Sequence, residues 1–148
     1  MRSMLLVLSL VSMVMAEAAM ADDKAADDLR GTTWKAWKAE DADKMHRFRE
    51  VWTFKENNIV AVTDENEAKS EFKYRHDSTK NPKEIDITYE SGPAKGKILK
   101  GIYKIEKDEL TICYIGPKSD EPEKRDRPTE FDVLKRADVV ILSFARKK

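Results

Sequence analysis

Few residues of this chain could do covalent chemistry. Its one cysteine is Cys113, in the stretch GIYKIEKDELTICYIG, and its two histidines are His46 and His76. A catalytic cysteine needs a neighbouring base, cation or helix N-terminus to lower its pKa, and both histidines are far from Cys113 in sequence. We therefore expect Cys113 to be structural, with a disulfide-linked dimer of an otherwise monomeric protein as the open alternative.

The run His76-Asp77-Ser78 contains the residue types of a hydrolytic triad. Consecutive residues cannot converge as nucleophile, base and orienting group, because that geometry takes them from separate segments. A turn ahead of Asn81-Pro82 explains the run better. A metal site from His46, His76 and Cys113 would need three strands to converge, without any closely spaced pair of ligands to support it.

Acidic residues are abundant, but nearly all lie among lysines and arginines, as solvated charges do. Asp86 is the exception, because it lies between Ile85 and Ile87, and we expect it to face outward from an alternating strand. The five glycines form no phosphate-binding loop. The sequence therefore predicts no enzymatic activity, no cofactor and no metal site.

The 148 residues include 28 basic and 28 acidic side chains, which gives a net charge of zero. This balance argues against nucleic acid or an anionic membrane as a partner. The basic end, Arg146 to Lys148, is too short for a nucleic-acid patch.

The first 21 residues have the pattern of a secretory signal peptide. Arg2 supplies a positive charge, Met4 to Met15 form an apolar run, and Ala19-Met20-Ala21 matches a cleavage site. The run is too short to span a bilayer, which takes about 20 residues. We expect a cleaved signal at residues 1–21, a polar lead-in at 22–30 and one domain at 31–148, exported to the periplasm or secreted without a membrane span.

From Gly31 onward, apolar residues recur with a period of two in about eight short runs, separated by Asn, Gly and Pro turn residues. Closing such a sequential sheet removes the two edges that an open sheet exposes. The sequence therefore predicts an all-β fold, a single antiparallel up-and-down β-barrel of about eight strands, with a sandwich as the alternative.

The stretch around Cys113, residues 101–116, predicts a hairpin with a turn at residues 106–109. Gly101 then faces Tyr114 on the apolar face, where the tyrosine ring can lie across the glycine. Ile102 faces Cys113 on the mixed outer face, so we expect a half-covered thiol.

Five motifs resemble those of a known family. They are a Leu-x-Gly-Thr-Trp opening (here Leu29 to Trp34, with one extra threonine), Asn-Pro-Lys-x-Ile-Asp (Asn81 to Asp86), Gly-Pro-x-Lys-Gly (Gly92 to Gly96), a Gly-Ile-Tyr hairpin reaching Cys-Tyr (Gly101 to Tyr114) and Arg-Pro-x-x-Phe (Arg127 to Phe131). On these motifs the chain resembles an uncharacterised family of exported lipocalin-like domains from planctomycete-type bacteria.

The resemblance implies a barrel of the lipocalin (calycin) type and no enzymatic activity. It also implies that Trp34 packs across the closed end of the barrel against Arg146, a cation–π contact worth about 1 kcal/mol.

A barrel of eight strands encloses either a filled core or room for one small ligand. Large apolar rings with one polar group suit such a cavity. Successive residues of a strand face opposite sides of the sheet. On this alternation, the candidate ligand-binding residues that face the barrel interior are Trp52, Phe54, Phe72, Tyr74, Tyr103, Ile112 and Tyr114, which could equally make a filled core. The leading hypothesis is a non-enzymatic barrel that binds a small hydrophobic or amphipathic molecule. The alternative is a protein-interaction or structural module of the cell envelope with a solid core, acting through the charged loop Lys118 to Pro128.

Overall fold

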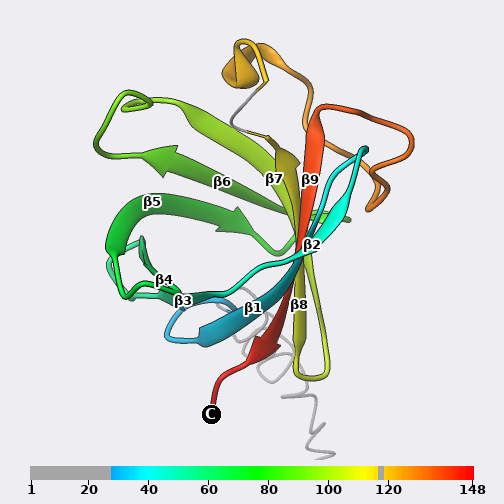
Figure 1. The fold of residues 1–148 in the computed structure, drawn as a ribbon. Coiled ribbons are helices and arrows are strands. Elements are labelled where there is room, and N and C mark those ends of the chain that lie inside the picture. The colour runs from blue at the N-terminus through cyan, green and yellow to red at the C-terminus, as the bar shows by residue number, and fades with distance from the viewer. Residues whose placement is uncertain (1–27, 117–118) are drawn as a thin grey trace, which may run out of the picture.

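The computed structural model describes residues 28–116 and 119–148, so the predicted signal peptide lies outside the described residues. The elements in this part of the chain are β1 (Thr33–Glu40), β2 (Met45–Arg47), β3 (Glu50–Phe54), β4 (Ile59–Asp64), β5 (Lys69–Asp77), β6 (Lys83–Tyr89), β7 (Ile98–Glu106), β8 (Glu109–Ile115), the 3-10 helix η1 (Pro122–Lys124) and β9 (Val139–Arg146) (Figure 1).

The strands form one closed antiparallel barrel. From β3 to β9 each strand pairs with the next, and β1 pairs with β3 on one side and β9 on the other. The short β2 pairs with the second half of β1 while β3 pairs with the first half, so the two together act as one interrupted strand. This confirms the predicted all-β, up-and-down barrel of about eight strands.

A bulge bends β1. Its register against β9 shifts between Ala36 and Lys38, which leaves Trp37 as the extra residue. Trp34 and Ala36 face the core before the bulge and Ala39 faces it afterwards, whereas Trp37 is 49% exposed.

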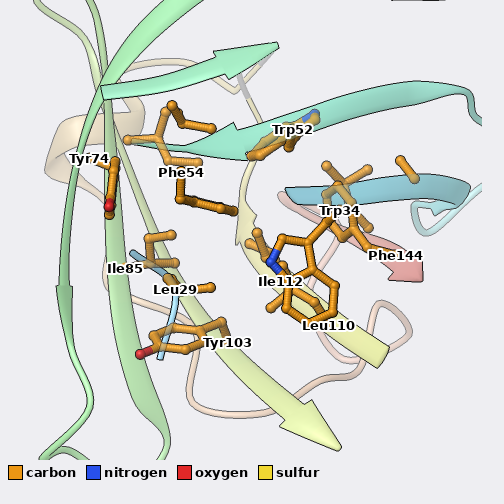
Figure 2. Close-up of a cluster of buried hydrophobic side chains, with 14 of the residues drawn as sticks. Leu29, Trp34, Trp52, Phe54, Tyr74, Ile85, Tyr103, Leu110, Ile112 and Phe144 are labelled. Atoms are coloured by element: carbon orange, nitrogen blue, oxygen red, sulfur yellow. The ribbon is translucent and has the colours of Figure 1, made fainter. Parts of the chain in front are cut away.

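Towards one end, the barrel interior is packed solid. Leu29 lies just ahead of β1, is 0% exposed and plugs this closed end, so the packed domain includes residues of the expected lead-in. Around it lie rings and branched side chains from most of the strands, including Trp34, Phe54, Tyr74, Ile85, Tyr103, Leu110, Ile112 and Phe144 (Figure 2).

The β7–β8 hairpin has the predicted register. Gly101 pairs with Tyr114, and Ile102 pairs with Cys113. A Cβ atom added at Gly101 would lie 2.9 Å from the Cβ of Tyr114 and 2.8 Å from the carbonyl oxygen of Cys113, so only glycine fits beneath the tyrosine. The predicted placement of Tyr114 across Gly101 is thereby confirmed.

The connection between β8 and β9 folds back over the outside of the barrel, and we call residues 119–138 the outer strap (Figure 1). Its Phe131 and Val133 pack onto the sheet in a second apolar cluster with Ile102, Cys113, Ile115, Val139 and Ile141. The prediction of a half-covered Cys113 was wrong: the thiol is completely buried, because the strap covers the outer face of the hairpin. A buried thiol cannot reach a second chain, which argues against the disulfide-linked dimer.

Arg127 fastens the strap to the sheet. Its Nη1 donates hydrogen bonds to the carbonyl oxygens of Gly101 at 2.8 Å and Ile85 at 3.2 Å. The same nitrogen lies 2.7 Å from Oδ1 of Asp86, which is held by charge rather than by an aligned hydrogen bond. Asp86 therefore faces outward, as predicted, and helps to anchor the strap.

At the closed end, Arg146 lies over Trp34. Cζ of Arg146 is 4.4 Å from the centroid of the indole ring, and the two residues pair across β1 and β9. The contact expected from the family resemblance is therefore present.

We expect Arg146→Ala to lower the melting temperature by about 3–6 °C, since loss of a partly exposed cation–π contact costs about 1 kcal/mol. Thermal unfolding followed by circular dichroism measures this, with Lys147→Ala as the control for loss of one positive charge. Equal melting temperatures for the two variants would show that the contact does not stabilise closure.

The reactivity of Cys113 tests whether the outer strap keeps the thiol buried. Burial raises the pKa of its thiol to about 12, so that about one thiol in ten thousand is ionised at pH 8. We expect a chromogenic disulfide reagent to label native protein far more slowly than protein unfolded in guanidinium. Fast native labelling, or a dimer on a non-reducing gel, would contradict the structure.

In the same assay, Arg127→Ala should speed up the labelling, because the strap loses its anchor and opens more often. Glu123→Ala, an exposed position on the same strap, is the matched control and should label like the unmodified chain. Unchanged labelling in Arg127→Ala would mean that the apolar cluster alone holds the strap down.

Candidate ligand-binding cavity at the open end of the barrel

A cavity of about 190 Å³ lies inside the barrel at the end opposite Trp34 and Leu29. Its lining residues come from the ends of six strands and the segments next to them: Phe48, Glu50, Trp52, Val62, Asp64, Ala68, Ser70, Phe72, Ile87, Tyr89, Leu99 and Tyr114. We call this space the mouth cavity. Five of its lining residues are aromatic, which gives it largely apolar walls.

The structure separates the seven predicted site residues by depth. Trp52, Phe72 and Tyr114 line the mouth cavity. The other four, Phe54, Tyr74, Tyr103 and Ile112, belong to the solid core nearer the closed end. Strand parity identifies the face that a residue occupies but not its depth along the barrel, so the sequence could not divide the set.

The deeper tyrosines direct their hydroxyl groups to protein partners. The Tyr103 hydroxyl donates to Oδ1 of Asp28 at 2.8 Å, and Lys83 donates to the other oxygen of that carboxylate at 2.6 Å. The Tyr74 hydroxyl donates to the carbonyl oxygen of Lys55 at 3.1 Å. These groups close the end of the barrel and do not face the mouth cavity.

Glu50 brings a charge into the cavity wall. Nε1 of Trp52 donates a hydrogen bond to Oε2 of Glu50 at 2.8 Å. Burial raises the pKa of Glu50, and the nearby charge of Asp64 adds to the rise, while the hydrogen bond from Trp52 opposes it. Glu50 and Asp64 are direct cross-strand partners on β3 and β4.

Two phenols complete the polar part of the wall. Burial, together with the negative charge of Glu50, raises the pKa of both Tyr89 and Tyr114, so each remains a neutral hydroxyl at physiological pH. The edge of one ring meets the face of the other between Phe72 and Tyr89, at 5.0 Å between centroids. With Ser70 at the rim, the lining residues of the cavity therefore combine aromatic surfaces, three hydroxyl groups and two carboxyl groups.

Sequence reasoning missed Glu50, Asp64 and Tyr89. A signal for Glu50 was present, because in the run RFREVWTF it alternates in phase with Trp52 and Phe54 and so lies on the apolar face. An acidic residue on an inward face indicates a functional position more strongly than another aromatic residue does.

A second hollow of about 400 Å³ lies beside the mouth cavity at the same end, and Phe48 and Tyr114 line both. It is bordered by Asp41 and Asp43 of the loop after β1 and by the start of β9. The acidic character of the cavity thus continues onto the rim.

The other candidate chemistry does not converge. His46 borders the rim, whereas His76 stacks on Tyr74, 5.8 Å between centroids, and Cys113 lies outside the barrel under the strap. The turn predicted for residues 76–78 begins later than expected: His76 and Asp77 end β5, and only Ser78 lies in the turn, where Asp77 accepts the backbone N–H of Thr79. Residues 28–116 and 119–148 contain no cluster of three His, Cys, Asp or Glu side chains placed to hold a metal.

The same residues also contain no helix long and apolar enough to cross a bilayer.

Comparison with protein-family models, curated proteins and solved structures finds no match. The candidate site is therefore defined by the geometry of this chain alone.

The raised pKa of Glu50 can be measured. In an NMR pH titration, we expect the indole N–H resonance of Trp52 to shift with a midpoint above the ordinary glutamate value of 4.5. Because the folded-state pKa exceeds the unfolded one, this group favours folding at acid pH, and that contribution is lost as pH rises through the folded value. Glu50→Gln should abolish the titration. A midpoint at or below 4.5 would contradict burial of this carboxyl group.

Proposed function

We propose that this protein is a non-enzymatic, exported, lipocalin-like barrel that binds one small hydrophobic or amphipathic molecule in the mouth cavity. The observation that carries the proposal is an aromatic-walled cavity of about 190 Å³ above a solid core. A dry apolar cavity of about 150 Å³ can hold benzene. The mouth cavity therefore suits a molecule of about one ring and is too small for a long lipid chain.

Two features support the lipocalin-like character and the export. The closed end carries the tryptophan–arginine contact that the resemblance implies, between Trp34 and Arg146. The sequence of residues 1–21 has the pattern of a secretory signal, which favours a periplasmic or secreted protein.

Binding is favoured over catalysis by the composition of the cavity. Glu50 and Asp64 could act as acid and base, but the lining residues in the described part of the chain include no cysteine, histidine or lysine beside them. We therefore assign these carboxyl groups to recognition.

The alternative function, an interaction or structural module, is favoured by one surface feature. On the outer face of β1 and β2, exposed Trp37 and Met45 border a groove together with four cations: Lys35, Lys38, Arg47 and Arg49. An acidic protein surface is the partner that would fit this groove. Under this alternative the mouth cavity has no ligand.

A titration with indole, a one-ring-system probe, tests the proposed function. We expect the Trp52 indole N–H signal to shift saturably in ¹⁵N-labelled protein, with sub-millimolar to millimolar affinity. Ser70→Phe should weaken binding at least about tenfold, because the new ring enters the cavity from its rim.

Lys69→Phe is the matched control, since it adds the same ring to the adjacent, outward-facing position of β5. This variant should bind indole like the unmodified chain. Absence of any saturable shift in the unmodified protein would reject the binding function and favour the interaction module.

A further inference from the structure

The charged side chains that line the mouth cavity are all acidic. Its lining includes Glu50 and Asp64 but no lysine, arginine or histidine in the part of the chain that the structure describes. The chain as a whole has equal numbers of acidic and basic residues, and most of its carboxyl groups lie among lysines and arginines. The cavity therefore differs in charge from the surface around it.

This arrangement is unfavourable for the empty protein. Glu50 and Asp64 are directly opposite each other on neighbouring antiparallel strands, where like charges destabilise a sheet. Asp64 is held in place by backbone N–H groups, since its Oδ1 accepts from Asn66 at 2.8 Å and from Ala68 at 2.9 Å. Glu50 is held by Trp52. Two like charges are thus fixed at the cavity wall. Lys35 and Arg49 line a separate outer hollow with the same two carboxylates, and neither cation lines the mouth cavity itself.

The other residues that line the cavity suit a positively charged ligand. Trp52, Phe72, Tyr89 and Tyr114 surround the same space, and the faces of such rings attract cations. Tyr89 and Tyr114 each bring a neutral hydroxyl group, which can donate a hydrogen bond to a ligand or accept one from it. Aromatic faces together with carboxylates are the groups that recognise an alkylammonium ion.

We propose that the ligand of the mouth cavity is a small primary or substituted amine, with an apolar body of about one ring and an ammonium group held between Glu50 and Asp64. This inference rests on the proposed binding function and adds the charge of the ligand to it. The neighbouring Asp41 and Asp43 border the adjoining hollow, where they extend the same negative potential to the entrance.

Three near-isosteric probes separate charge from shape: 2-phenylethylamine, 2-phenylethanol and phenylacetate. Titrated at pH 7 and moderate salt, with the Trp52 indole N–H signal as the readout, the amine should bind at least about tenfold more tightly than the alcohol. The carboxylate should bind most weakly, because it faces two like charges.

The variant Glu50→Gln should remove most of the preference for the amine while binding of the alcohol persists. The Gln side-chain oxygen can still accept from the Trp52 indole, so retained alcohol binding shows that the cavity is intact. Glu65→Gln, an exposed position on the adjoining turn that does not line the mouth cavity, is the matched control for loss of one nearby negative charge and should keep the preference.

The outcomes distinguish the two proposals. Equal affinity for all three probes, or tightest binding of the carboxylate, overturns the amine inference and leaves the binding function in place. No binding of any probe overturns both. An amine preference that survives Glu50→Gln overturns the role of that carboxyl group.

Discussion

The pairing of β9 with β1 is the constraint on which the rest of this structure depends. Once eight strands close, every strand residue faces either the interior or the outside, and the width of the interior is fixed. Trp34 and Arg146 lie where the first and last strands pair, so their contact stabilises the closure itself. Leu29 adds a plug at the same end, which leaves the opposite end as the place where the interior opens.

The outside of the barrel carries a second layer. The strap covers the outer face of β7, β8 and β9, so that Cys113 is buried on a side that a bare barrel would expose. Arg127 fastens it by binding backbone carbonyl groups and Asp86 together. The Arg-Pro-x-x-Phe motif thereby acquires a structural explanation: Arg127 anchors, Pro128 is buried and Phe131 packs on the sheet.

The interior changes character with depth. Near the closed end, the polar groups of Tyr74 and Tyr103 have protein partners. Near the open end, Glu50, Tyr89 and Tyr114 line a cavity instead. Proteins generally bury charge only where a partner compensates for it. Two like-charged carboxyl groups lie opposite each other at the mouth, and the described residues that line the mouth cavity include no lysine, arginine or histidine. This pair is therefore the feature for which a ligand gives the simplest physical account.

The sequence by itself determined the order of the strands and the face of most strand residues, because period-two alternation is a local property. The bulge in β1 is the exception, since it turns Ala39 instead of Lys38 toward the core. The sequence therefore predicted the closed barrel, the register of the β7–β8 hairpin and the outward position of Asp86. Tertiary structure alone decided two further matters. Depth along the barrel separated Trp52, Phe72 and Tyr114, at the cavity, from Phe54, Tyr74, Tyr103 and Ile112, in the core. The folding back of the strap buried Cys113. Both depend on contacts between residues distant in sequence, which local alternation does not encode.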